Sequence, residues 1–255
     1  MWRKRLITVA VAAGLAAQAH AFVLTNLTQT AGAPQTGYPL GDVWKVTLNS
    51  AEVGSSFSID WLVPAGTVGD SPLPIDLTAT STWTLTSYGP DGIGLDVVVD
   101  NTTVLPPNTN TAILSFGFGV DPDSTAALTA GTVFDGLANQ TKQQQFPGGF
   151  KQIDVCVFGA NGCSGGNVNR GLQAGSADTV QLAVRPISGT YGSSVDLLFF
   201  PLKFQGTWGS FEPAGGGTSG GASTGGGIPE PSGLALIGLG LAALGLAKRQ
   251  RHAST

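Results

Sequence analysis

The chain has 255 residues, of which 42% are hydrophobic and 11% charged, and its formal net charge is −4 at pH 7. The two ends hold half of the basic residues, so residues 22–213 set six Lys and Arg against fifteen Asp and Glu, a net charge of about −9. Such an acidic segment lacks the basic patch that nucleic acid or anionic lipid requires, and we expect no nucleic-acid partner.

Histidine occurs only at His20 and His252, close to the two ends. Because both ends have the character of removable segments, the mature chain is expected to contain no histidine. This excludes a Ser-His-Asp or Cys-His arrangement and a His-containing zinc site. A two-carboxylate mechanism such as glycoside hydrolysis remains as the enzymatic alternative, but no pair can be selected among thirteen Asp. We expect a protein that is not an enzyme and that uses no cofactor.

Residues 1–21 have the three parts of a secretory signal peptide. A positively charged start at residues 2–5 precedes an apolar stretch that is twelve residues long, 6–17. An Ala-His-Ala sequence at residues 19–21 then offers a cleavage site between small residues. We expect the mature chain to begin at Phe22, with cleavage two residues earlier as the alternative.

The segment from residue 22 to residue 213 is predicted to be all-β. Apolar residues alternate with polar ones in runs separated by Gly, Pro, Asn and Asp, which is typical of strands with one buried face. Residues 195–204 are apolar on both faces, as expected of a central strand. About eight such strands predict an antiparallel β-sandwich. The alternating positions are Trp44, Val46 and Leu48; Phe57, Ile59, Trp61 and Val63; Trp83 and Leu85; Leu95, Val97 and Val99; Leu114, Phe116, Phe118 and Val120; Ile153, Val155 and Val157; and Val180, Leu182 and Val184.

Two stretches lack this alternation. Residues 124–145 follow no clear period, and we expect a short helix or a long loop there. Residues 214–227 contain only Gly, Ser, Thr and Ala, which cannot bury much apolar surface. They predict a flexible linker with an end-to-end distance of about 20 Å between the domain, 22–213, and the C-terminal tail, 228–255.

The two cysteines, Cys156 and Cys163, are separated by six residues. In an exported chain such a pair is expected to form a disulfide. The Asn161-Gly162 step between them favours a tight turn, so a hairpin could bring the two sulfurs together. The alternative, a reactive or metal-binding pair, lacks the spacing and companion ligands of a zinc site.

Asp121 and Asp123 flank a proline and could place two carboxylates around Ca²⁺, a cation that prefers oxygen ligands. Their spacing matches no complete calcium-binding loop, so we favour an Asp-Pro turn and expect no metal site.

Four tryptophans of the domain could offer flat faces to a sugar ring. Trp44, Trp61 and Trp83 occupy alternating apolar positions, where sandwich cores place large aromatic side chains, so we expect them in the core. Trp208 stands among glycines and is predicted to be the exposed one, a candidate ligand contact.

The C-terminal tail has three parts in a fixed order. Pro229, Glu230 and Pro231 precede an apolar run at 233–247, and a basic end follows. The fifteen apolar residues predict a helix of about 22 Å, which snorkelling side chains and local thinning can match to a bilayer core of about 30 Å. The basic end should remain on the cytoplasmic side; its residues are Lys248, Arg249 and Arg251.

This tail resembles the PEP-CTERM signal of bacterial envelope proteins. The resemblance implies secretion, a membrane-anchored stage facing the periplasm, and removal of the tail by an exosortase. It also implies a Gram-negative source with an exopolysaccharide system, and release to the cell surface or the medium. A permanent membrane anchor is the alternative.

A second resemblance covers most of the domain. It rests on FPGGFKQIDVCVF at 146–158, NGCSGG at 161–166 and FPLKFQ at 200–205, which are similar to the cistern family of PEP-CTERM proteins. That family implies export and anchoring and brings no catalytic residues. We expect a non-enzymatic envelope or matrix protein; the alternatives are a carbohydrate-binding module and, third, a carboxylate-dependent glycosidase.

Overall fold

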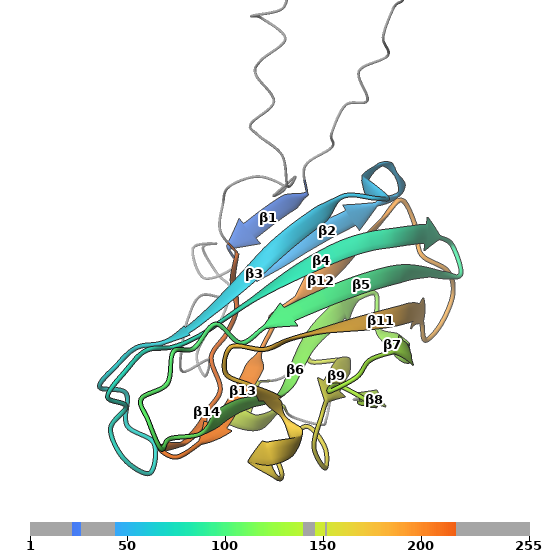
Figure 1. Cartoon of the computed structure of the whole chain (residues 1–255). Coiled ribbons are helices and arrows are strands. Elements are labelled where there is room, and N and C mark those ends of the chain that lie inside the picture. The colour runs from blue at the N-terminus through green and yellow to red at the C-terminus, as the bar shows by residue number, and fades with distance from the viewer. Residues whose placement is uncertain (1–21, 27–43, 140–145, 151, 218–255) are drawn as a thin grey trace, which may run out of the picture. The chain divides into compact units, whose positions relative to one another are not determined.

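The computed structural model describes residues 22–26, 44–139, 146–150 and 152–217. Contacts divide the chain into two units, Met1–Ala222 and Ser223–Thr255, and every described residue belongs to the first. The described residues form two antiparallel sheets and contain no α-helix (Figure 1). The predicted all-β sandwich is confirmed.

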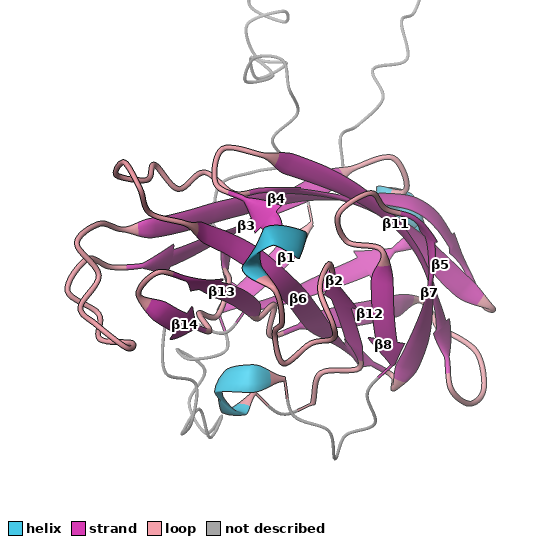
Figure 2. Ribbon diagram, turned by 60° about the horizontal axis from the view of Figure 1, so that its bottom comes forward, coloured by secondary structure: helices cyan, strands magenta, loops and turns pink. Residues whose placement is uncertain are grey.

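The two sheets lie one over the other as layers (Figure 2). The larger one follows the order β1-β2-β12-β6-β13-β14, with β9 and β10 paired to β6 and β8 paired to β9. The smaller one has the order β15-β3-β4-β5-β11-β7. The strands of the larger sheet are β1 (Val23–Asn26), β2 (Trp44–Asn49), β6 (Thr111–Asp121), β8 (Gly136–Asn139), β9 (Val155–Phe158), β10 (Leu172–Gln173), β12 (Ser194–Leu198), β13 (Leu202–Gly206) and β14 (Gly209–Phe211). Those of the smaller sheet are β3 (Ser56–Val63), β4 (Leu77–Gly89), β5 (Gly92–Asp100), β7 (Ser124–Ala130), β11 (Ala177–Pro186) and β15 (Gly216–Gly217), and three 3-10 turns, η1 (Ser50–Glu52), η2 (Pro147–Gly149) and η3 (Val168–Arg170), lie in connections.

An aromatic core fills the space between the sheets, because alternate residues of both sheets point inward. The ring of Trp83 stacks on Phe57 from the neighbouring strand, with centroids 5.9 Å apart. Across the sandwich it meets Phe118 edge-on at 5.2 Å. The indole N–H groups of Trp83 and Trp61 donate hydrogen bonds of 2.7 and 2.8 Å inside the core, so neither polar group is left unpaired at depth.

Most predicted strands lie where the alternation placed them, and the inward residues of β3, β4, β5 and β11 are buried. The described residues contain fifteen strands rather than about eight, because several have only two to four residues and carry no readable period. A short helix or a long loop is predicted over 124–145, but the described part of it, 124–139, contains β7 and β8. Residues 140–145 lie outside the described residues. Of β7 only Ser124 and Ala126 are buried, which is too little apolar surface to mark a strand in the sequence.

Residues 195–204 do not form the single central strand that was predicted. The chain breaks between β12 and β13 at Phe199 and Phe200, whose φ angles are 75° and 39°. Both strands still pair with one edge of β6. Leu198 is paired with Gly119 and Leu202 with Phe116, so this segment contains one residue more than the part of β6 that it faces. This bulge sends Phe200 into the core between the sheets and Phe199 to the other side of the larger sheet.

β6 is buried on both faces over all but its last residue. Phe116 and Phe118 point into the core between the sheets, whereas Leu114 belongs to a small cluster on the outer side. The prediction placed Leu114 beside the two phenylalanines. It is wrong because the register between β6 and β13 shifts next to Leu114, which turns its side chain over.

An outer cluster covers the second face of β6, and it consists of Phe146, Phe150, Ile153, Cys156, Cys163, Phe199 and Ala214. Glycines on that face of β6 allow the residues of the outer cluster to pack directly against the strand backbone. A Cβ on Gly119 would lie 2.3 Å from the carbonyl oxygen of Gln152, and a Cβ on Gly117 would lie 2.9 Å from Ile153. The Phe-Gly-Phe-Gly pattern of β6 therefore reflects two packed faces rather than one buried and one solvated face.

The start of the predicted linker belongs to the domain. Ala214 is buried and forms a bridge with Pro201, and β15 pairs with the edge of β3. A Cβ on Gly215 would lie 2.3 Å from the Ile59 side chain, so this glycine permits close packing. The domain therefore extends to at least Gly217, four residues beyond the predicted boundary; the rest of 214–227 lies outside the described residues.

Asp178 is a buried acid that organises the turn after β7. Its Oδ2 accepts hydrogen bonds from the backbone N–H groups of Thr132, Val133 and Phe134 at 3.3, 2.8 and 2.8 Å. Three donors on one acceptor oxygen offset the loss of water around Asp178, a residue that is only 7% exposed.

We predict that Asp178→Ala lowers the free energy of unfolding by about 2–4 kcal/mol, because three backbone N–H groups, that of Phe134 being buried, lose their acceptor. Asp178→Asn retains one acceptor oxygen and should cost less. Urea titration measures both changes. Asp135→Ala, at an exposed position in the same connection, is the control, and an equal loss in the control and in Asp178→Ala would contradict the role of these hydrogen bonds.

Phe22, the predicted first residue of the mature chain, is part of the core. It is 7% exposed and its ring lies edge-on to Phe57 at 5.2 Å. The neighbouring Val23 is 61% exposed, so the two side chains point to opposite sides of β1.

Phe22→Ala is predicted to lower the free energy of unfolding by about 3 kcal/mol, since it deletes a buried ring. Val23→Ala should change it by less than about 0.5 kcal/mol, as expected at an exposed site. Thermal unfolding of the two variants, measured side by side, tests the difference. Similar midpoints would mean that residue 22 does not hold β1 to the core.

Candidate functional site

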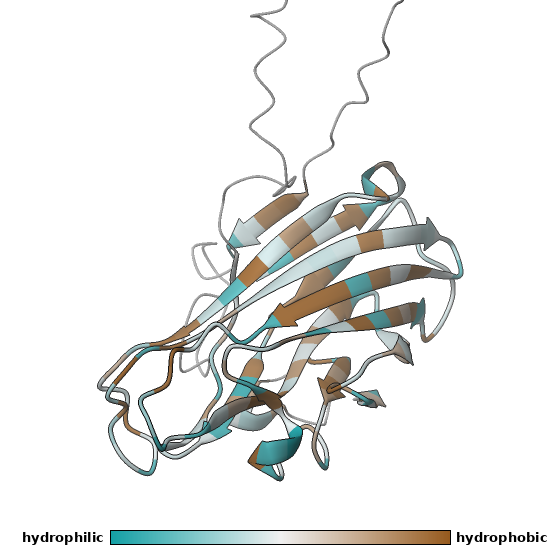
Figure 3. Cartoon of the chain, in the orientation of Figure 1, coloured by the Kyte–Doolittle hydropathy of each residue, from teal (hydrophilic) through white to brown (hydrophobic). Residues whose placement is uncertain are grey.

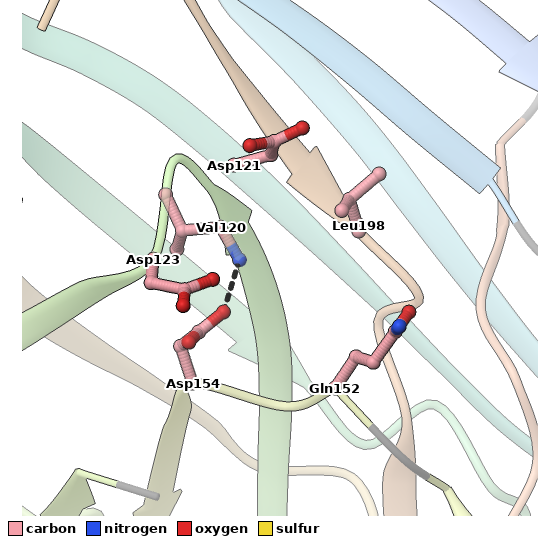
Figure 4. Close-up of a pocket in the computed structure, with 6 residues that line it drawn as sticks. All are labelled: Val120, Asp121, Asp123, Gln152, Asp154 and Leu198. Atoms are coloured by element: carbon pink, nitrogen blue, oxygen red, sulfur yellow. Dashed lines mark hydrogen bonds between the residues drawn. The ribbon is translucent and has the colours of Figure 1, made fainter. Parts of the chain in front are cut away.

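A pocket of about 140 Å³ lies where β6 ends and the chain turns toward β7. The turn contains a cis peptide between Asp121 and Pro122. The end of β12 and the residues before β9 supply the other walls (Figure 4). The lining residues are Val120, Asp121, Asp123, Gln152, Asp154 and Leu198.

The carboxylates of this pocket do not converge on one point. Asp154 is 5% exposed, and its Oδ2 accepts a hydrogen bond of 2.6 Å from the backbone N–H of Val120. Figure 4 shows the Asp123 carboxylate near that of Asp154, whereas Asp121 points away from both. Within the described part of the chain there is no group of three or more His, Cys, Asp or Glu placed to hold a metal ion. The structure thus does not bring Asp121 and Asp123 together around a cation.

The hydroxyl groups of Ser124 and Tyr191 stabilise the turn. Ser124 donates to the carbonyl oxygen of Pro122 at 2.7 Å, and its oxygen is also 2.7 Å from the Tyr191 hydroxyl. Burial raises the pKa of Tyr191 from its ordinary value near 10 to about 12, so the phenol stays neutral at a pH where an exposed tyrosine ionises. These contacts give the Asp-Pro segment a structural role.

The volume of the pocket limits its chemistry. Ligand pockets usually enclose about 300–1,000 Å³, so a cavity of about 140 Å³ is too small for a sugar ring with its neighbours. Asp154, Gln152 and Tyr191 were not singled out from the sequence, because no local motif marks them and only the fold brings them to the turn.

The tryptophans do not form a sugar-binding platform. Trp208, predicted to be exposed, is only 8% exposed, and its carbonyl accepts a hydrogen bond of 2.9 Å from the backbone N–H of Asp70. The prediction is wrong because the 64–76 loop folds over the β13–β14 turn, which the flanking glycines could not reveal. Trp61 and Trp83 lie in the core as predicted, and Trp44 is half-buried against it.

Cys156 and Cys163 form the predicted disulfide, with Cα atoms 6.2 Å apart. The connection is not a hairpin, since Cys156 lies on β9 and Cys163 lies in the loop that follows. The Ser115 hydroxyl of β6 donates to the carbonyl oxygen of Cys163 at 3.0 Å. The disulfide therefore fastens this loop over the outer face of β6, within the outer cluster.

A row of hydroxyl side chains on β4 was present in the sequence but was not singled out. Five threonines alternate with buried residues along this strand, and they lie on the solvent side of the smaller sheet. The T-x-T-x-T-x-T-x-T pattern was the available signal.

The predicted processing residues lie outside the described residues. This applies to the signal peptide at 1–21, to Pro229, Glu230 and Pro231, and to the apolar run and basic end with Lys248, Arg249 and Arg251. Among the residues that the structure describes, no helix has the length and apolar character needed to cross a membrane.

Comparison with known proteins identifies the tail. Residues 227–250 match the PEP-CTERM protein-sorting motif. Proteins with this motif are exported and processed by an exosortase at the cell surface. No curated protein matches the chain, and the resemblance of the domain to the cistern family gains no support.

The neutral state of Tyr191 leads to a prediction at alkaline pH. Its pKa is raised in the folded state, so the folded protein retains the phenol proton between about pH 10, where an exposed tyrosine ionises, and about pH 12. The contribution of this group to stability is complete below pH 10 and is lost as the pH rises toward 12. Tyr191→Phe should therefore show a smaller fall in unfolding free energy between pH 9.5 and 11.5, measured by urea titration. Equal slopes for the two proteins would contradict burial of the phenol.

Proposed function

We propose that this protein is a non-enzymatic component of the cell envelope or of the extracellular exopolysaccharide matrix, delivered by an exosortase. The single observation that carries the proposal is the sorting motif at 227–250. Within this segment and at its end, Pro-Glu-Pro, the apolar run and the basic residues stand in the order that such processing requires. In this scheme the signal peptide directs export and the tail holds the chain in the membrane until it is cut.

Several properties of the domain support a non-catalytic role. Residues 22–213 contain no histidine, and the acidic pocket at the end of β6 is too small for a sugar substrate. The strongly acidic composition suits a soluble surface that does not adhere to nucleic acid or anionic lipid. We also propose membership of the cistern family, on the basis of the similar sequence segments at 146–158, 161–166 and 200–205.

Two features of the fold support export of the domain and cleavage of its signal peptide before Phe22. The disulfide suits an oxidising compartment outside the cytoplasm. Phe22 lies in the core directly after the predicted cleavage site, so cleavage there leaves a chain whose first residue already belongs to the domain. Cleavage two residues earlier would add only two residues before it.

Mass spectrometry of the protein from its native envelope and medium tests the proposal by reading both termini. We expect a chain that starts at Phe22 and ends near Pro231. A triple substitution, Pro229→Ala with Glu230→Ala and Pro231→Ala, should leave the tail on the protein and retain it in the membrane. Ser232→Ala is the matched control and should be processed normally. A wild-type chain that still carries residues 233–251 would show instead a permanent anchor.

A further inference from the structure

The solvent side of the smaller sheet has an unusual composition. Its central strand β4 presents Thr78, Thr80, Thr82, Thr84 and Thr86, because the residues between them point into the core. The strands of this sheet carry no Lys or Glu, although long charged side chains commonly cover solvated sheet faces. Figure 3 shows β4 as a mostly pale band between more strongly coloured neighbours. We call this side, with Ser56, Ser58 and Asp60 of β3 and Asp96, Val98 and Asp100 of β5, the hydroxyl face.

The strand register arranges these short side chains in rows. Thr80 lies between Asp60 and Asp100. Further along β4, Thr82 lies between Ser58 and Val98, and Thr84 lies between Ser56 and Asp96. Strands are about 4.8 Å apart and alternate residues about 6.8 Å apart, so polar groups recur at regular intervals across three strands. Such a surface is long and shallow and suits an extended polymer better than a compact ligand.

Some hydroxyl groups of this face are held by hydrogen bonds to one another, and they can still form hydrogen bonds with a ligand. Ser56 and Thr84 share a hydrogen bond of 2.8 Å across the strands, and Thr102 donates to Thr78 at 2.9 Å. A hydroxyl has one donor and two acceptor positions, so each member of these pairs keeps unused capacity. The carboxylates of Asp60, Asp96 and Asp100 are acceptors for further hydroxyl groups.

A hollow of about 540 Å³ lies at one end of the hydroxyl face. It exists because Gly94 and Ala183, which are paired across β5 and β11, present almost no side chain there. Ser87, Asp91 and Arg185 line its sides. Its volume falls in the range of ligand sites, and a carboxylate with a planar guanidinium offers acceptors and donors for neighbouring hydroxyls of a sugar.

We propose that the hydroxyl face and its hollow bind a neutral, hydroxyl-rich polysaccharide. The negative charge of the hydroxyl face favours a neutral polymer over an acidic polymer or a second copy of this chain. An acidic polymer would meet Asp60, Asp96 and Asp100, and a second copy of this chain would set these carboxylates against one another. A protein partner would need a buried apolar anchor, whereas the exposed Leu62 and Val98 stand apart on different strands. The inference extends the proposed function, on which it rests for the presence of the domain outside the cell.

Affinity electrophoresis of the full chain, purified in mild detergent, tests this assignment. The gels contain dextran, mannan or a β-1,3-glucan as neutral polymers, or alginate as an acidic one. We expect retardation by at least one neutral polymer and none by alginate. Thr80→Val with Thr82→Val should weaken the retardation at least tenfold, and Arg185→Gln should weaken it by a smaller factor. Valine suits a strand, so the fold should persist, and circular dichroism verifies this.

The matched control removes two hydroxyls from the other sheet, by Thr25→Val with Thr47→Val on β1 and β2, and should bind as wild type. Absence of retardation by every neutral polymer would overturn the proposal, as would equal retardation by alginate or unchanged binding of the Thr80/Thr82 variant. Loss of self-association in that variant, measured by sedimentation, would assign the face to contacts between copies instead.

Failure of this inference is distinguishable from failure of the proposed function. Binding is measured on the purified protein, and processing is measured in the cell by the mass of the chain. The Thr80/Thr82 variant should be exported and cut normally, and the variant without the Pro-Glu-Pro motif should bind polysaccharide normally.

Discussion

Burial of β6 on both faces is the constraint on which the rest of this structure depends. This strand pairs with β12 and β13 along one edge and with β9 and β10 along the other, so it joins segments from distant parts of the chain. Its phenylalanines complete the core around Trp83, and its glycines admit the outer cluster on the opposite side. A strand with two packed faces needs a second apolar layer, and the disulfide keeps that layer in place.

Charged groups inside this framework are few, and those that are buried have ionic or backbone partners. Asp178 binds three backbone N–H groups, and Lys203, 4% exposed, forms an ion pair with Glu212 at the edge of the larger sheet. Removing one member of a buried pair leaves an uncompensated charge, so such groups fix one arrangement of the loops. The remaining acids lie mainly at the surface, where they set the negative charge of the domain and thereby its choice of partners.

The tail and the domain of this exported protein have different roles: the tail carries the sorting motif, and the domain carries the proposed recognition surface. The sorting motif, at 227–250, is a feature of the sequence of the tail. The domain is a stapled sandwich whose recognition surface, in our proposal, is a broad face of short hydroxyl side chains. That face depends on the regular register of β3, β4 and β5 and not on an exposed tryptophan.

The sequence by itself determined the features that depend on local order: the sorting motif, the all-β class, the alternating strands and the disulfide pair. Period-two alternation and the composition of the two ends are local signals, so no knowledge of the fold was needed. Tertiary structure alone decided which residues meet. It buried Trp208 under the 64–76 loop, split residues 195–204 at a bulge and turned Leu114 outward. It packed residues 214 and 215 against the domain and paired residues 216 and 217 with β3. It also brought Asp154 and Tyr191 to the Asp-Pro turn. Each of these outcomes depends on strand register and on packing between segments far apart in the chain, and a single-residue shift in register reverses the side on which a side chain lies.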